Sequence, residues 1–224
     1  MNILGSVHSK IKTVIFDLDG TLIDSAPSIL AGLNMAIKKS KLLPSLPLDS
    51  CLVGPPLKEI LSKLVGDQAN VDLDILASNF KQYYDSEGFK ASIPYPGVDE
   101  LLNQLACNVS LYLATNKRLE PTLKIIDYFG WSLLFDGIYA IDKFKDNPFS
   151  DKTSMINVLI HSEAIEKEHV IYVGDRIEDL EASKLNGINA ILVNWGYGEF
   201  KNNSSINGFQ YADSPKELYE MIVK

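Results

Sequence analysis

The sequence predicts an α/β protein in which a parallel sheet is covered by helices on both faces and is interrupted by one all-helical insertion. Three short apolar runs, at 14–16, 111–114 and 171–174, each stop abruptly at a polar residue. Continuous apolar runs of this length are typical of buried parallel strands. A long segment, 25–93, contains only helical patterns. We therefore expect the sheet to begin before this segment and to resume after it.

The second half of the chain alternates strand and helix patterns. Weaker apolar runs at 137–141 and 190–193 are further strand candidates. Apolar residues recur at helical spacing within 98–105, 123–129 and 155–160, between the strand candidates. This alternation indicates a doubly wound, Rossmann-like parallel sheet.

The helical insertion is predicted to form a domain of its own. Its apolar stripes follow one another without a strand signal between them, at 29–37, 57–65 and 73–84. An all-helical block placed directly after the first strand is typical of a cap above the sheet. We expect a core domain made of 1–24 and 94–224 and a helical cap domain at 25–93.

Composition excludes several classes of protein. Hydrophobic residues make up 46% of the chain and charged residues 22%, which argues against disorder. The net charge is −8, with only two arginines, so no nucleic-acid partner is expected. Cys51 and Cys107 are too few for a disulfide framework or a zinc site. We expect no secretion signal and no membrane partner, because polar residues interrupt every long apolar run, and we expect a cytoplasmic location.

Two carboxylates follow the first strand. Side chains alternate along an extended chain, so Asp17 and Asp19 can point the same way, and Gly20 permits the turn that follows. One alternative is a solvated acidic turn. Another is an EF-hand calcium loop, but its glycine is the sixth residue and this glycine is the fourth. A metal-dependent carboxylate site is favoured, because open α/β sheets bind ligands at strand ends.

Two more carboxylates follow the third apolar run. Asp175 leaves the strand end, and Asp179 falls in the first turn of the next helix. Bringing these two together with Asp17 and Asp19 would cost about 4 kcal/mol per close pair at an effective dielectric near 20. A cation must therefore hold them. An all-oxygen set without histidine predicts Mg²⁺.

The middle apolar run delivers polar residues to the same edge of the sheet. A hydroxyl and backbone amides at a strand end can hold a phosphoryl oxygen, so we expect Thr115 and Asn116 to bind phosphate. Lys117 and Arg118 follow directly. They are either phosphate contacts or solvated loop charges, and both readings stay open.

Four motifs together resemble one family. DLDGT at 17–21, ATN at 114–116, a downstream lysine and GDRIED at 174–179 resemble the haloacid dehalogenase-like hydrolases. The helical insertion resembles their phosphoglycolate phosphatase-like branch. The motifs occur in the family's order, and the resemblance covers nearly the whole chain.

This resemblance implies roles for the acidic residues. Asp17 would be the nucleophile that attacks phosphorus and forms an aspartyl-phosphate. Asp19 would protonate the departing alcohol and then deprotonate the water. The metal ligands would be the side chains of Asp17 and Asp175 and the main-chain carbonyl of Asp19, with Asp179 supporting them. True haloacid dehalogenases lack an acid at the position of Asp19, which favours phosphate chemistry, with Thr115 binding the phosphoryl group.

The phosphate-binding lysine is harder to assign. The family's lysine is usually followed by proline, but none of Lys143, Lys145 and Lys152 is. We favour Lys152, because it directly precedes the helical stripe at 155–160, and a helix N-terminus adds favourable potential for phosphate. Lys145 is the second choice, and an ordinary surface lysine is the alternative for each.

The implied function is hydrolysis of a small phosphate ester. We expect a Mg²⁺-dependent phosphomonoesterase acting on a small phosphorylated metabolite such as phosphoglycolate. The alternatives are a phosphosugar mutase of the β-phosphoglucomutase type and a non-catalytic protein that binds a phosphate ligand. In the cap, 54–59 resembles a substrate-specificity loop, and its Gly-Pro pair is equally typical of a turn. Tyr83, Tyr84 and Tyr95 are candidates either for the cleft or for the core.

Overall fold

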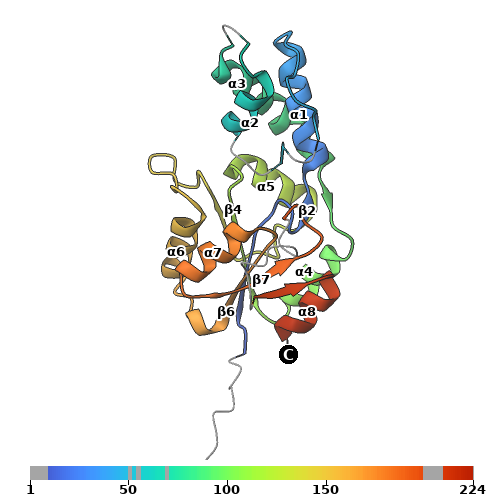
Figure 1. Ribbon diagram of the computed structural model, residues 1–224. Helices are drawn as coiled ribbons and strands as arrows, with labels where there is room; N and C mark the ends of the chain where they lie inside the picture. Colours follow the sequence, from blue (N-terminus) through green and yellow to red (C-terminus); the bar gives the residue numbers. More distant parts are fainter. Residues whose placement is uncertain (1–9, 50–51, 54–56, 69–70, 199–208, 224) are drawn as a thin grey trace, which may run out of the picture.

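A six-stranded sheet, parallel throughout, lies at the centre of the computed structural model (Figure 1). The structure describes residues 10–49, 52–53, 57–68, 71–198 and 209–223. The strand order is β5-β4-β1-β6-β7-β8. The strands are β1 (Thr13–Phe16), β4 (Ser110–Thr115), β5 (Gly137–Ala140), β6 (Val170–Gly174), β7 (Asn189–Val193) and β8 (Gln210–Ala212). The predicted α/β fold class is confirmed, and β8 is an edge strand that the sequence patterns did not indicate.

Each face of the sheet packs against its own helices. The helices of the core are α4 (Val98–Ala106), α5 (Leu119–Tyr128), α6 (Lys152–Ser162), α7 (Ile177–Leu185) and α8 (Pro215–Val223). Along β1, Val14 and Phe16 belong to the apolar cluster that includes α4, α5 and α8. Ile15 points to the opposite face and belongs to the cluster that includes α6 and Ala182 of α7. Burial on both faces explains why the strands are continuous apolar runs.

The register of the strands sets the level at which they end. Phe16 of β1 pairs with Leu113 of β4 on one side and with Val173 of β6 on the other. The residues that follow these three strands therefore emerge at one edge of the sheet. This is the edge where ligands bind in open α/β sheets.

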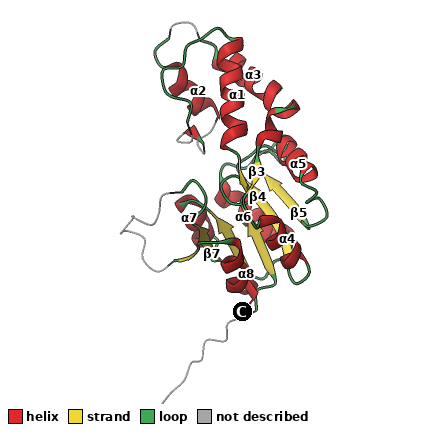
Figure 2. Ribbon diagram, turned by 90° about the vertical axis from the view of Figure 1, so that its right-hand side faces the viewer, coloured by secondary structure: helices red, strands yellow, loops and turns green. Residues whose placement is uncertain are grey.

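Three helices stand above this edge, at one end of the molecule (Figures 1 and 2). They are α1 (Ala26–Lys39), α2 (Leu57–Val65) and α3 (Leu73–Ser86), and a short 3-10 turn, η2 (Gly88–Ala91), follows them. Asp72 caps α3, since its side chain accepts hydrogen bonds from the N–H groups of Asp74 and Ile75. The apolar faces of these helices join the same cluster as α4 and α8.

A short ribbon connects the helical segment to the core. β2 (Ile23–Asp24) and β3 (Ile93–Pro94) pair as antiparallel strands, with Ile23 opposite Pro94. The sequence patterns did not indicate it, because two residues are too few to show a period. Our proposed domain boundaries, after residue 24 and before residue 94, fall at this ribbon. In the described part of the chain, no helix has the length and apolar character needed to cross a bilayer.

The central strand β4 offers a test of this packing. Leu113 is fully buried, whereas Leu133 is 98% exposed. We expect Leu113→Ala to lower the free energy of unfolding by about 2 to 5 kcal/mol, because it leaves a cavity between the sheet and its helices. Leu133→Ala is the matched control and should change it by less than about 0.5 kcal/mol. Urea denaturation followed by circular dichroism measures both, and equal effects would contradict the placement of β4.

Candidate active site

Asp17, Asp175 and Asp179 meet at the carboxyl edge of the sheet. Asp17 follows β1, and its backbone N–H donates to the carbonyl of Val173 at 2.8 Å. Asp175 follows β6, and Asp179 is the third residue of α7. One carboxylate oxygen from each of the three aspartates lies within 4.8 Å of the others. All three side chains are buried.

Asp179 also shapes the turn that carries Asp175. Its Oδ2 accepts hydrogen bonds from the backbone N–H groups of Asp175 at 3.1 Å and Arg176 at 3.0 Å. An acidic side chain here also complements the N-terminus of α7. The four-residue spacing between Asp175 and Asp179 therefore lets the carboxylates on either side of the strand-to-helix turn face the same point.

The unused oxygen of Asp175 indicates what this group of aspartates can bind. Its Oδ2 accepts a hydrogen bond from the backbone N–H of Tyr197 at 2.8 Å. Its Oδ1 is buried and has no hydrogen-bond partner among the residues that the structure describes. A buried carboxylate oxygen without a partner is costly, and a hard divalent cation would satisfy it. The donor set thus fits Mg²⁺.

Lys152 lies beside these aspartates. Its Nζ is 2.9 Å from Oδ2 of Asp17 and also contacts Oδ1 of Asp179. It is the first residue of α6, whose N-terminus is capped by Asp151, and it is buried. Lys145, the second choice from the sequence, is exposed. Lys152 therefore lies beside Asp17, and its role as the phosphate-binding lysine stays a prediction.

Burial makes the carboxylates hard to ionise together. It raises the pKa of the Asp17 carboxyl to about 6, which Lys152 opposes and the charge of Asp179 reinforces. It also raises the pKa of Asp175 to about 7, and the charges of Asp17 and Asp179 act in the same direction. For Lys152, burial acts to lower the pKa, but the charges of Asp17 and Asp179 outweigh it and raise the pKa well above its ordinary value. Lys152 therefore stays cationic beside the aspartates.

The carboxylate of Asp19 takes a different partner. Its Oδ1 lies 3.0 Å from Nζ of Lys117, an ion-pair distance, although the two atoms lack good hydrogen-bond alignment. Its side chain is not one of the three that share the 4.8 Å grouping. Gly20 follows with φ +82°, and a Cβ at this position would lie 2.6 Å from Cγ of Asp175. The DLDG turn therefore needs glycine both for its backbone and for its space.

Thr115, at the end of β4, and the residues that follow it differ in how far they are exposed to solvent. Thr115 is buried, and its Oγ1 accepts a hydrogen bond from the N–H of Lys117 at 3.2 Å. Asn116 is exposed. The reading of Lys117 and Arg118 as solvated loop charges is wrong, because the Lys117 side chain is only 8% exposed and Arg118 pairs with Asp85 of α3 at 2.5 Å.

Tyr197 is a site residue that the sequence did not indicate. Its N–H holds Asp175, and its hydroxyl donates to Oδ1 of Asp24 at 2.7 Å. The same hydroxyl accepts from the N–H groups of Ser25 at 2.6 Å and Ala26 at 2.9 Å. It thus connects a buried aspartate to the start of α1. Tyr197 lies in a loop with no helical or strand period, so only the fold shows its proximity to Asp175.

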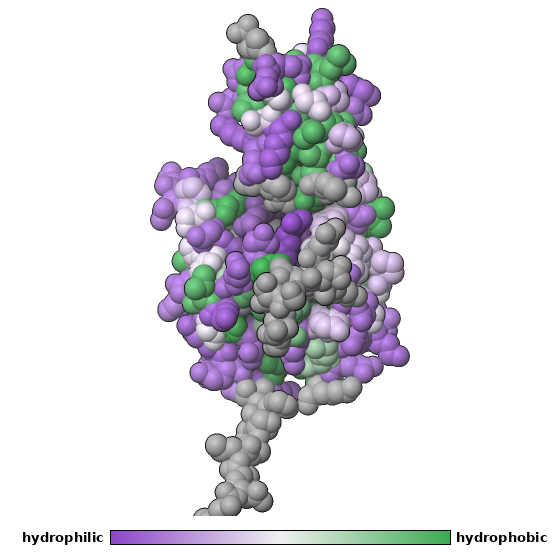
Figure 3. Space-filling view, viewed as in Figure 1, coloured by the Kyte–Doolittle hydropathy of each residue, from purple (hydrophilic) through white to green (hydrophobic). Residues whose placement is uncertain are grey.

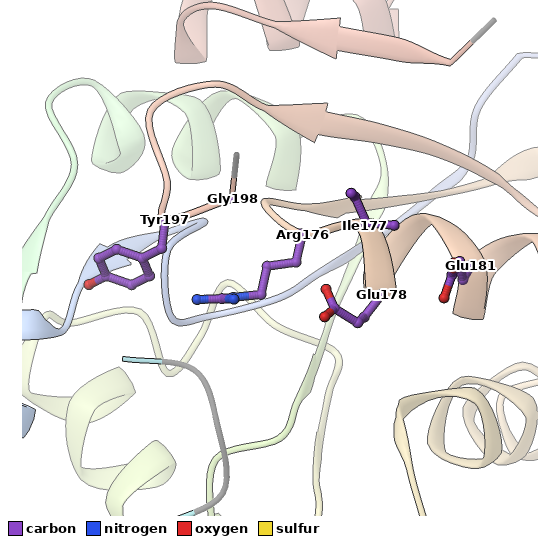
Figure 4. A pocket seen from close by; sticks show the side chains of 6 residues that line it. All are labelled: Arg176, Ile177, Glu178, Glu181, Tyr197 and Gly198. Atoms are coloured by element: carbon purple, nitrogen blue, oxygen red, sulfur yellow. The ribbon is translucent and has the colours of Figure 1, made fainter. Parts of the chain in front are cut away.

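A pocket of about 420 Å³ lies at the start of α7, next to Tyr197 (Figure 4). Its lining consists of Arg176, Ile177, Glu178, Glu181, Tyr197 and Gly198. Nη2 of Arg176 donates to the carbonyl of Val53 at 2.8 Å, so the helical segment contacts the rim of the pocket. Hydrophilic residues lie around the junction of the helical segment and the sheet on the face shown in Figure 3. Part of the expected specificity loop, 54–56, lies outside the described residues.

A doubly wound sheet with buried aspartates at the carboxyl edge of its strands, and with helices inserted after its first strand, defines a class of α/β protein with an acidic site at that edge. A model of the family described as "Haloacid dehalogenase-like hydrolase" matches residues 14–193. The chain belongs to this family.

Relatives with assigned names span nearly the whole chain. Phosphoglycolate phosphatase of Aquifex aeolicus is 30% identical over 94% of this chain and 96% of its own length. Tyrosine-protein kinase PtkA of Mycobacterium tuberculosis is also 30% identical, over 94% of this chain and 72% of its own length. Among solved structures, a predicted phosphatase from Clostridium acetobutylicum has a TM-score of 0.80 at 27% identity, covering 96% of this chain and 99% of that one.

The raised pKa values of Asp17 and Asp175 predict how pH and Mg²⁺ act on stability. Both carboxyls have folded pKa values above the ordinary 3.8, near 6 and 7. The contribution of these raised pKa values to the stability of the metal-free protein is therefore fully present below about pH 4. It is lost as the pH rises through 6 and 7 and the carboxyls ionise. Mg²⁺ needs the ionised forms, so it should raise Tm more at about pH 8 than at about pH 5.

Thermal melts with EDTA or Mg²⁺ at the two pH values measure this effect. A hundredfold excess of Mg²⁺ over its Kd should add about 2.7 kcal/mol of stability at the higher pH. The control is Asp175→Asn, which replaces a candidate carboxylate ligand with a neutral amide and should reduce the Mg²⁺ effect. An equal Mg²⁺ effect at both pH values, or an unchanged one in the variant, would contradict a metal site at these aspartates.

Proposed function

We propose that this hydrolase is a Mg²⁺-dependent phosphomonoesterase that acts on a small phosphorylated metabolite such as phosphoglycolate. Membership of the family and the named relatives support a hydrolase acting on phosphoric monoesters. One observation carries the proposal further. The Asp17 carboxylate is buried within 4.8 Å of two further aspartates and lies 2.9 Å from a lysine. A nucleophilic carboxylate needs such positive charge beside it to approach an anionic phosphate.

Asp17, Asp175 and the carbonyl of Asp19 would hold the ion, with Asp179 supporting them. When bound, Mg²⁺ would supply positive charge to the phosphoryl oxygens and to the nucleophile. The unpartnered Oδ1 of Asp175 supports this assignment. Thr115, Asn116 and Lys152 would bind the phosphoryl group, with Lys152 contributing a buried cation.

The reaction would proceed in two steps on Asp17. Its carboxylate oxygen forms a bond to phosphorus while the ester P–O bond breaks, and the bonding pair leaves with the alcohol oxygen. Asp19 gives its proton to that oxygen. In the second step a water oxygen attacks the phosphorus of the aspartyl-phosphate as its carboxyl oxygen departs, and Asp19 takes the proton from the water. Inorganic phosphate is released, Asp17 is restored as a carboxylate, and Asp19 again carries the proton that it gave up in the first step.

The inserted helices would enclose the substrate. Contacts such as Arg118 with Asp85 and Arg176 with Val53 tie these helices to the core close to the aspartates. An enclosed site excludes bulk water and favours a small molecule over the surface of a folded protein.

Two other activities share this chemistry. A phosphosugar mutase would return the phosphoryl group to a substrate, and the name of PtkA refers to transfer to tyrosine. A non-catalytic phosphate-binding protein would need no buried nucleophile. Release of inorganic phosphate from many esters, with no requirement for a sugar bisphosphate, would distinguish hydrolysis from both kinds of transfer. A phosphate-release screen over a panel of small esters, including phosphoglycolate, sugar phosphates and nucleotides, would then identify the substrate.

The nucleophile gives the sharpest test. We expect Asp17→Asn to lower Mg²⁺-dependent hydrolysis of p-nitrophenyl phosphate by about 10⁴-fold or more, because an amide cannot form the phosphorylated intermediate. The variant keeps the shape of the side chain and removes one buried negative charge, so its Tm should not fall. Mass spectrometry of acid-quenched wild-type enzyme should find phosphate on Asp17. Retained turnover in Asp17→Asn would refute the mechanism.

The two candidate lysines form a matched pair. Lys152→Ala should lower kcat/KM by about 10² to 10³-fold, because it removes a buried cation beside Asp17. Lys145→Ala removes the same charge from an exposed position and should change it less than about twofold. Steady-state kinetics on p-nitrophenyl phosphate measures both. The reverse result would assign the phosphate to Lys145.

A further inference from the structure

Lys117 is a buried lysine to which the proposed reaction gives no role. Its side chain is 8% exposed, and Nζ lies 3.0 Å from Oδ1 of Asp19, whose own side chain is 23% exposed. Burial acts to lower the pKa of the Lys117 ammonium, but the charge of Asp19 outweighs it, and the pKa is raised above its ordinary value. A buried ion pair is weak evidence for a stabilising role, since apolar residues in its place often give a protein of equal stability. The pairing with Asp19 therefore asks for a functional explanation.

The backbone of Lys117 is held in place on both sides. Its N–H donates to Oγ1 of Thr115 at 3.2 Å, and its carbonyl accepts from the N–H of Ile141 at 3.3 Å. The backbone from which the Lys117 side chain extends is thus anchored at the ends of β4 and β5, and Nζ itself is placed between Asp19 and the Tyr84 ring. A group fixed in this way can define the position of the carboxylate that it pairs with.

The other side of Lys117 faces the inserted helices. Nζ lies 4.9 Å from the ring centroid of Tyr84 on α3, and the ring is buried. The Tyr84 hydroxyl lies 3.3 Å from Oγ of Ser28 on α1, and Ser92 donates to the same oxygen at 2.9 Å. Lys117 is therefore packed between Asp19 and a buried polar group of the helical segment.

We propose that Lys117 is a positioning residue for Asp19, an inference that rests on the proposed phosphatase function. Its ammonium holds the Asp19 carboxylate away from the three clustered aspartates and toward the side where the leaving alcohol and the attacking water must lie. Tyr84 of α3 holds the ammonium from above. The position of the proton-transfer group thus depends on the seating of the helical segment.

The proposal assigns no new bond-making step to Lys117. Asp19 gives one proton to the alcohol oxygen as the P–O bond breaks and receives one from water as phosphate forms, so its protons balance over one turnover. Lys117 keeps all three of its protons. Losing Lys117 should therefore impair whichever step needs Asp19, while attack by Asp17 on an ester with a good leaving group proceeds.

Two kinds of ester separate these effects. An alkyl phosphate needs a proton on its departing alkoxide, but p-nitrophenolate departs without one. We expect Lys117→Met to lower kcat/KM for the best alkyl phosphate of the substrate screen by about 100-fold. With p-nitrophenyl phosphate, rapid mixing should show a burst of about one p-nitrophenol per enzyme, followed by slow turnover, because only the water step then depends on Asp19.

Matched variants make the result specific. Lys124→Met also removes a lysine, and Lys124 contacts the helical segment at the carbonyl of Asp85 rather than at Asp19. Lys124→Met should leave the ratio of kcat/KM for the alkyl phosphate to kcat/KM for p-nitrophenyl phosphate unchanged. Lys117→Arg, which keeps a cation, should recover part of the alkyl phosphate activity. Asp19→Asn shows how far kcat/KM for the alkyl phosphate falls when proton transfer by Asp19 is lost completely. If Lys117→Met melts below the assay temperature, Lys117→Gln is used in its place.

The outcomes separate this inference from the proposed function. If the wild type releases phosphate from no ester in Mg²⁺, the phosphatase function fails and the role of Lys117 fails with it. If the wild type is active and Lys117→Met lowers kcat/KM equally for the two esters, or for neither of them, the positioning role alone is overturned. A selective loss with the alkyl ester, matched by a p-nitrophenol burst, supports it.

Discussion

Repulsion between buried negative charges is the constraint on which the site depends. Asp17, Asp175 and Asp179 are nearly inaccessible to water, yet one oxygen of each lies within 4.8 Å of the others. At this spacing each pair costs several kcal/mol in a protein interior. Lys152 offsets part of this repulsion. Burial, and after it the charges of the neighbouring aspartates, raises the pKa values of Asp17 and Asp175. The folded chain therefore holds a place where added positive charge is favourable.

The sheet creates this constraint through its register. Because β4, β1 and β6 run parallel and in step, each delivers its next residue to one edge. The helices then refine the site, since Asp179 locks the turn after β6 and Lys152 begins α6. Apolar packing along the strands thus supplies the free energy that keeps like charges together, and the carboxylate of Asp17 gains its properties from the residues packed around it.

Local patterns were sufficient for much of this arrangement. Asp17 and Asp175 were identified because an apolar strand stops at each, and the helical stripes located the inserted segment. Long-range packing accounts for what was missed. The pairing of Lys117 with Asp19 joins two separate loops, and Tyr197 reaches Asp175 from a loop after β7. Neither the spacing nor the polarity of those residues distinguishes them from ordinary loop positions.

The β2-β3 ribbon has a consequence for how such a fold can diversify. The chain leaves the core at Asp24 and returns at Ile93, and these two residues are paired neighbours. Since exit and re-entry points lie side by side, a segment of another length or architecture can be exchanged between them without changing the distance that the core must bridge. The inserted segment and the core can thereby vary separately, provided that a new segment keeps the contacts that core residues beside the aspartates need, such as that of Tyr84 with Lys117.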